Sequence, residues 1–135
     1  PRHVDHFRPI RDWNEKEIWA IMEKYRVRPH PAYQMGFGRV SCMKCIFGNA
    51  DQFASAFAID PKGTQEVANY EKEFGVTIKR KESVEELVAK GTPYEAISPE
   101  LSRLSMMRVF PEDIIMPEGT WTLPAGAFGE SCGPI

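Results

Sequence analysis

Two cysteines separated by two residues, in Cys42-Met-Lys-Cys45, are the clearest chemical feature of this 135-residue sequence. Two thiolates at this spacing can ligate one metal ion, or two corners of one iron–sulfur cluster, from a single turn of the chain. Gly36 and Gly38 precede the pair and permit the tight backbone that such a turn needs. The alternative is a pair of buried, inert cysteines, since cysteine is among the most buried residue types. One pair supplies only two ligands, so a metal site here requires further groups.

Two other residues are candidates for chemistry. Cys132 lies near the C-terminus, and it is a candidate third ligand that folds back to the pair, a candidate nucleophilic thiol, or a lone surface thiol. His30 lies between two prolines, where its ring can ligate zinc, contact a nucleotide or cap a helix.

Basic residues are concentrated in the first third of the chain. Residues 1–45 contain nine Lys/Arg and five Asp/Glu, whereas residues 46–135 contain eight and fourteen. Clustered arginines bind phosphate or sulfate through bidentate contacts, so Arg11, Arg39 and His30 are candidate contacts to an anionic substrate. Arg39 and Lys44 would also favour thiolates at the cysteine pair. The alternative is an uneven surface charge without a ligand.

Capping signals and helical periodicity predict the helices that must position these residues. Asn14 with Glu17 predicts a capping box opening a helix over 14–25, which the prolines at 29 and 31 would end. Similar signals predict helices from 49 to 60, over 62–74, from 83 to 91 and after 98. The expected buried stripes are Ile18/Ile21/Met22/Tyr25, Ala50/Phe53/Ala54/Phe57/Ala58 and Val67/Tyr70/Phe74. Residues 76–78 are expected to be extended, and Met106-Met107 to lie in the core.

The predicted fold is mostly α with long loops, in one domain over 1–135. It would comprise residues 1–47, helical residues 48–109 and an irregular tail over 110–135. Residues 1–47 would include the loop that carries Cys42 and Cys45, which we call the cysteine loop. A composition of 42% hydrophobic and 27% charged residues is typical of a globular domain, and no run approaches the ~20 apolar residues of a membrane span. The net charge of −2 argues against nucleic-acid binding. Three cysteines favour a reducing, cytoplasmic compartment over a disulfide framework.

Several segments resemble, in order, the family of adenylyl-sulfate and phosphoadenylyl-sulfate (PAPS) reductases. They are Arg8-Pro-Ile-Arg-Asp-Trp13, the helix with Ile18-Trp19, His30-Pro-Ala-Tyr33, Gly36-Phe37 and Val40-Ser-Cys-Met-Lys-Cys45. In that family a Pro-x-x-Asp-Trp segment opens a helix. A His/Asn-Pro segment, a Gly-aromatic step and, in the iron–sulfur members, a C-x-x-C follow. Residues 47–53 and 124–133 are similar to phage and bacterial PAPS-reductase-like relatives.

The resemblance implies that the chain is the C-terminal portion of an α/β adenine-nucleotide α-hydrolase-like protein, whose Ser-Gly-Gly-x-Asp-Ser phosphate loop would precede Pro1. It implies that Cys42 and Cys45 are half of a four-cysteine [4Fe-4S] set. It also implies that Cys132 resembles the nucleophile of a C-terminal Glu-Cys-Gly, which attacks the sulfate sulfur to form a thiosulfonate. Two departures are visible. Ser131 interrupts the Glu-Cys-Gly order, and Ile46-Phe47 replaces a Thr-Arg pair, so a changed substrate or a sulfur-transfer role is equally consistent.

Two hypotheses follow. The first is a PAPS-reductase-like enzyme of sulfur metabolism that binds an adenine sulfonucleotide mainly through the preceding domain and uses a thiol reductant protein. This chain alone would then be inactive. The second is a zinc-stabilised structural or interaction module, in which Cys42, Cys45 and Cys132 with His30 or another group close a tetrahedral site.

Overall fold

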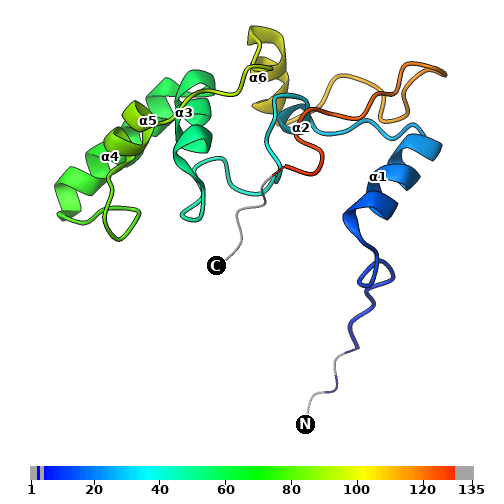
Figure 1. The fold of residues 1–135 in the computed structure, drawn as a ribbon, viewed down its shortest axis with the longest axis horizontal. Coiled ribbons are helices and arrows are strands. Elements are labelled where there is room, and N and C mark those ends of the chain that lie inside the picture. The colour runs from blue at the N-terminus through cyan, green and yellow to red at the C-terminus, as the bar shows by residue number, and fades with distance from the viewer. Residues whose placement is uncertain (1–2, 4, 130–135) are drawn as a thin grey trace. The chain divides into compact units, whose positions relative to one another are not determined.

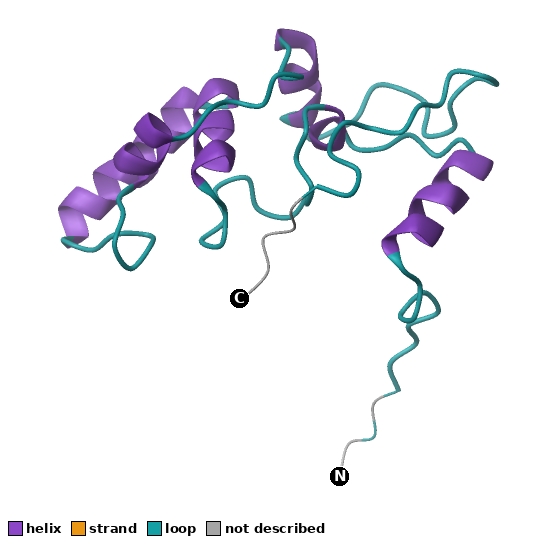
Figure 2. Ribbon diagram, viewed as in Figure 1, coloured by secondary structure: helices purple, strands orange, loops and turns teal. Residues whose placement is uncertain are grey.

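The computed structural model describes residues 3 and 5–129, and it is helical (Figures 1 and 2). The described residues contain no strand, so the mostly α prediction is confirmed for them, whereas the α/β classification of the wider protein stays a prediction. No helix in this part of the chain is both long and apolar enough to cross a membrane. The chain divides into two compact units, Pro1–Arg28 with Asp113–Leu123, and Pro29–Glu112 with Pro124–Ile135.

The first unit contains helix α1 (Glu15–Lys24), which begins as predicted. The Asn14 side chain accepts a hydrogen bond from the Glu17 N–H at 3.0 Å, and the Glu17 carboxylate accepts one from the Asn14 N–H at 2.8 Å. The predicted buried stripe is only partly correct, since Tyr25 is 56% exposed and Trp19 is the buried side chain of the helix. The Trp19 indole can leave water because its N–H donates to the Glu15 carboxylate at 3.1 Å.

Helix α1 ends earlier than the prolines require. Arg26 adopts a left-handed backbone with φ of 55°, and its N–H donates to the Glu23 carbonyl. The Val27 N–H donates to the Met22 carbonyl at 2.8 Å. This pair of bonds is a Schellman motif, which satisfies the last carbonyls of the helix without a glycine. The helix therefore ends where predicted, at Tyr25, but the turn at Arg26 ends it and not the prolines at 29 and 31.

An antiparallel bridge between Val27 and Ile115 joins the two segments of the first unit. The Arg28 N–H donates to the Ile114 carbonyl at 2.8 Å, and the Trp121 indole N–H donates to the Val27 carbonyl at 2.9 Å. These bonds hold residues 113–123 against the segment that leaves α1.

The second unit contains five helices in its described residues: α2 (Pro31–Gln34), α3 (Ala50–Ile59), α4 (Pro61–Phe74), α5 (Val84–Lys90) and α6 (Pro99–Ser105). Asn49, Asp60, Ser83 and Ser98 cap the last four, each accepting a backbone N–H in the first turn. Gly75 ends α4 in a left-handed conformation, as predicted. Each cap satisfies a backbone donor that the helix itself cannot pair, which explains why these predicted starts are correct.

Helices α3, α4 and α5 pack around a small apolar core. Phe53, Ala68, Val84 and Leu87 form it, each at most 2% exposed. Helix α3 is buried around most of its middle, and Ser55 and Ala56 are fully buried there. The predicted stripes are therefore wrong at Phe57 on α3 and at Tyr70 and Phe74 on α4, which are 40%, 56% and 66% exposed. The exposed pair on α4 stacks ring on ring instead, with centroids 5.9 Å apart.

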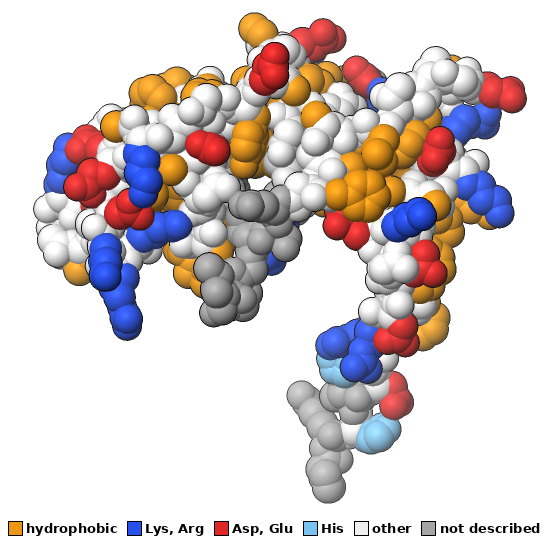
Figure 3. Space-filling view, viewed as in Figure 1, with side chains coloured by type: hydrophobic (Ala, Val, Ile, Leu, Met, Phe, Trp, Pro, Cys, Tyr) orange, Lys and Arg blue, Asp and Glu red, His pale blue; other side chains and the backbone are white. Residues whose placement is uncertain are grey.

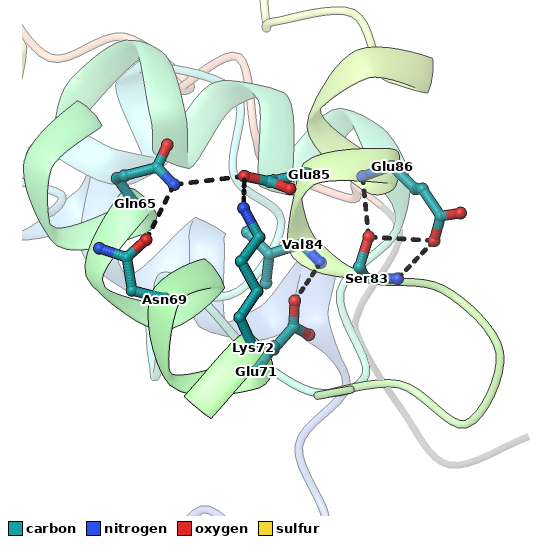
Figure 4. Close-up of polar contacts among 8 residues, drawn as sticks. All are labelled: Gln65, Asn69, Glu71, Lys72, Ser83, Val84, Glu85 and Glu86. Carbon is teal, nitrogen blue, oxygen red and sulfur yellow. Dashed lines mark hydrogen bonds and ion pairs between the residues drawn. The ribbon is translucent and has the colours of Figure 1, made fainter. Parts of the chain in front are cut away.

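A buried carboxylate joins α4 to α5 (Figure 4). Glu71 accepts backbone hydrogen bonds from Ile78 at 2.7 Å and from Val84 at 2.9 Å. The segment over 76–78, predicted to be extended, forms no strand, and it bends at Ile78, whose amide reaches this carboxylate. Lys72 and Glu85 add an exposed ion pair at 2.7 Å, and Figure 3 shows acidic and basic side chains interspersed over this part of the unit.

Helices α2 and α6 pack against each other. Met35 is fully buried, Leu104 is 7% exposed, and the Ser102 hydroxyl donates to the Met35 sulfur at 3.8 Å. Met106 and Met107, expected in the core, are 52% and 40% exposed because α6 ends at Ser105 and the chain turns outward.

We predict that Phe53→Ala lowers the free energy of unfolding of the second unit by about 3–5 kcal/mol, since the ring is fully buried and its removal leaves a cavity. Phe74→Ala, on the exposed face of α4, should cost no more than about 1 kcal/mol. Urea unfolding followed by circular dichroism measures both. Equal losses would contradict the placement of the core.

Candidate functional site

The cysteine loop follows a glycine-dependent turn. Gly36 has φ of 104°, and a Cβ there would lie 3.3 Å from the Tyr94 side chain. Phe37 is buried and meets the Tyr94 ring edge to face, with centroids 5.0 Å apart. The Tyr94 N–H in turn donates to the buried Ser55 hydroxyl on α3 at 2.9 Å. The start of the loop is therefore fixed to α3 through one aromatic contact.

Residues 126–129 lie over the same turn. The Gly126 N–H donates to the Tyr33 carbonyl at 2.8 Å, and a Cβ on Gly126 would lie 2.2 Å from the Phe37 carbonyl oxygen. A Cβ on Gly129 would lie 3.1 Å from the Gly38 Cα. Only glycine fits where the two backbones come so close. Cys132 lies three residues further on, outside the described residues, so its predicted role stays a prediction.

Cys42 and Cys45 are accessible and free of disulfide bonds. Cys42 is exposed and Cys45 half-buried, so the alternative of two buried, inert cysteines is wrong. The described residues contain no group of three or more His, Cys, Asp or Glu side chains placed to hold a metal ion. They fit a metal centre only in part, because they offer two thiol ligands and no third.

Lys44, between the two cysteines, forms an ion pair. Its ammonium lies 2.8 Å from the Asp60 carboxylate, with side chains 18% and 24% exposed. The hydrogen bond from Lys44, followed by that from the Gly63 N–H, lowers the pKa of the Asp60 carboxyl below its ordinary value. The positive charge that we expected to favour thiolates is therefore partly neutralised by Asp60.

Gln52 on α3 contacts the loop from the other direction. The backbone N–H of Gln52 donates to the Asn49 side chain at 2.8 Å, as the predicted cap requires. Its side-chain amide donates to the Met43 carbonyl at 3.0 Å and to the Cys42 carbonyl at 3.4 Å. The sequence did not reveal this role, because a glutamine three residues after a cap is as readily explained by the cap itself.

A cavity of about 280 Å³ opens beside the loop. It brings together two of the predicted substrate contacts, His30 and Arg39, and includes Ser41 and Met43 on either side of Cys42. The remaining lining is mostly apolar: Ala32, Met35, Phe37, Val40, Ile59, Ser105 and Met106. Such a site suits a ligand with an apolar body and an anionic group.

Arg11, the third predicted substrate contact, belongs to the first unit. It lies exposed in a turn, where its N–H donates to the Arg8 carbonyl at 3.2 Å. Its predicted role stays a prediction.

His30 caps α2, which confirms one of its three predicted roles. Its Nδ1 accepts a hydrogen bond from the Ala32 N–H at 3.1 Å. The neutral ring must then carry its proton on Nε2. Desolvation by burial lowers the pKa of the ring from its ordinary value of 6.5, so the neutral form dominates at neutral pH.

Comparisons with known proteins agree with the resemblance seen in the sequence. Residues 2–47 match the sequence profile of the phosphoadenosine phosphosulfate reductase domain. An uncharacterised 37.8 kDa protein of Escherichia phage 186 is 35% identical over 66 residues, which are 49% of this chain and 20% of that protein. Adenosine 5'-phosphosulfate reductase of Allochromatium vinosum is 31% identical over 42 residues, which are 31% of this chain and 16% of that enzyme. The chain thus matches a fifth or less of these relatives. No solved structure gives a significant match.

We predict that His30 makes the protein less stable in mild acid. Below pH 6.5 the unfolded chain takes up a proton at His30 that the folded chain resists, so the free energy of unfolding falls as the pH drops toward the lower folded-state pKa. The contribution is complete above pH 6.5. His30→Asn keeps an acceptor for the Ala32 N–H but does not titrate, so this part of the pH dependence should disappear.

Urea unfolding at about pH 5 and pH 7.5 measures the effect. The unsubstituted chain, unfolded under the same two conditions, is the reference. An unchanged pH dependence in His30→Asn would contradict the assignment.

Proposed function

We propose that this chain forms part of a PAPS-reductase-like enzyme acting on an adenylyl sulfonucleotide, or in a related sulfur transfer. The match of residues 2–47 to the phosphoadenosine phosphosulfate reductase domain and the similarity to an adenosine 5'-phosphosulfate reductase support this proposal. One observation carries this proposal. Two accessible thiols, on Cys42 and Cys45, lie on a loop whose residues also line a cavity containing His30 and Arg39. A thiol-based centre beside an anion-binding cavity is what such chemistry needs.

Different residues of the cavity would bind different parts of the substrate. The Arg39 guanidinium would bind a phosphate or sulfate oxygen, and the His30 Nε2–H would donate a neutral hydrogen bond. The apolar lining, including Met35 and Phe37, would cover the flat part of a nucleotide.

Cys42 and Cys45 would supply two thiolate ligands to a [4Fe-4S] cluster, with the other two ligands contributed from outside the described residues. When bound, the cluster would supply electron-transfer capacity or local charge beside the cavity. Exposed thiols in free form also suit a reducing compartment such as the cytoplasm.

Cys132 would act as the nucleophile or as a further ligand. Its thiolate would form a bond to the sulfate sulfur while the bond from that sulfur to the phosphate oxygen breaks, and the nucleotide would leave with the electron pair. A thiol of a reductant protein would then attack the Cys132 sulfur and displace sulfite. A second thiol of that protein would break the resulting mixed disulfide, so that Cys132 is released as a thiol and the reductant leaves as a disulfide. Gly129, the last residue that the structure describes, lies against Gly38, and this nearness to the cysteine loop supports the proposal.

We predict that anaerobic reconstitution with iron and sulfide gives a brown chain with thiolate-to-iron absorbance, and that Cys42→Ser with Cys45→Ser abolishes it. Inductively coupled plasma analysis and visible spectroscopy measure both. Cys132→Ser serves as the comparison, because loss of metal there identifies Cys132 as a ligand and retention leaves it available as a nucleophile.

The same measurement distinguishes the zinc module. One tightly bound zinc per chain, with no visible absorbance and no iron, would identify the structural role instead. A chain that binds neither metal would refute the metal centre in both forms.

A further inference from the structure

A side chain of α3 holds the backbone of the cysteine loop. Gln52 is 5% exposed, and its amide donates to the carbonyls of Cys42 and Met43. A buried amide without acceptors is costly, so the position of Gln52 and the conformation of the loop depend on each other. These bonds use carbonyl oxygens and leave the thiol of Cys42 exposed.

A second contact fixes the loop between the two cysteines. The Lys44 ammonium reaches Asp60, which also caps α4 through the Gly63 N–H at 2.9 Å. The pair is mostly shielded from water, unlike the Lys72–Glu85 pair, whose side chains are 63% and 49% exposed. Shielding strengthens an ion pair that also makes good hydrogen bonds, whereas exposed pairs contribute little.

Two glycines make room for these contacts. A Cβ on Gly48 would lie 2.9 Å from the Gln52 amide carbon, and a Cβ on Gly63 would lie 2.1 Å from the Asp60 carboxylate and 3.0 Å from the Lys44 ammonium. Both contacts therefore depend on space that only glycine leaves beside them.

We propose that Gln52 and the Lys44–Asp60 pair are positioning residues that hold the backbone between Cys42 and Cys45 in one conformation before any metal binds. The inference rests on the proposed metal centre and deepens it. A loop that is already ordered loses less conformational entropy when its thiols bind a metal, so its affinity is higher. Outer groups that orient ligands typically change metal affinity by about 10- to 100-fold when removed.

The test uses four matched substitutions in the full chain. Gln52→Met and Lys44→Met remove the two contacts while keeping side-chain length. Gln65→Met and Lys72→Met are the controls, because Gln65 and Lys72 lie exposed on α4 and contact Asn69 and Glu85, away from the cysteine loop. Circular dichroism and thermal unfolding establish which variants retain the helical fold, and with two independent positions the test survives the loss of one variant.

The first readout needs no metal. Hydrogen–deuterium exchange of the amides over 42–48 should be at least about tenfold faster in Gln52→Met and Lys44→Met than in the unsubstituted chain and the controls, because the loop opens more often. Unchanged exchange in both variants would overturn the proposal, whatever the metal data.

The second readout is the affinity for Co²⁺, followed by its thiolate charge-transfer and d–d absorbance. Weaker binding by about 10- to 100-fold in the two variants, with unchanged controls, supports positioning of the thiols. Equal Co²⁺ affinity in all four variants would overturn the positioning role.

A different result would refute the metal centre alone. If the unsubstituted chain and Cys42→Ser show the same absence of thiolate–Co²⁺ absorbance, the proposed metal centre fails. Faster exchange in the two variants would then still establish that these residues order the loop.

Discussion

A helix buried on most of its surface must find a partner for each polar side chain that it carries, and α3 is such a helix. Gln52 and Ser55 are buried on it, at 5% and 0% exposed, and Asp51 lies at its edge. Their partners lie in two loops, the cysteine loop and the connection between α5 and α6. Gln52 donates to the cysteine loop, Ser55 accepts from Tyr94, and Asp51 accepts from the Thr92 N–H at 2.8 Å. The described side chains leave no buried polar atom unpaired, so α3 organises the loops around it.

The same constraint determines which groups of the cysteine loop remain available. Its carbonyls bond to α3 and its lysine pairs with Asp60, whereas the thiols of Cys42 and Cys45 stay accessible. The cavity next to them carries one guanidinium and one neutral imidazole among apolar side chains. The carbonyls and the lysine of the loop thus make structural contacts, whereas its two thiols stay accessible.

The family match and the support of the site come from different parts of the chain. The matched profile ends at residue 47 and includes both cysteines, His30 and Arg39. Gln52 and Asp60, which hold the cysteine loop, lie beyond it. The residues that match the family profile and the residues that hold the cysteine loop therefore lie in separate segments of the chain.

The helix starts and the cysteine pair could be predicted from the sequence, because both depend on residues close together in the chain. The caps at Asn14 and Ser83 depend only on side chains and amides three residues apart, and both are present as predicted. Which face of each helix is buried depends on distant neighbours, so Tyr25, Phe57 and Phe74 were placed wrongly. Only the tertiary structure shows that His30 and Arg39 line the same cavity and that Gln52 contacts the cysteine loop. Spacing along the chain does not determine which loop a buried side chain will reach.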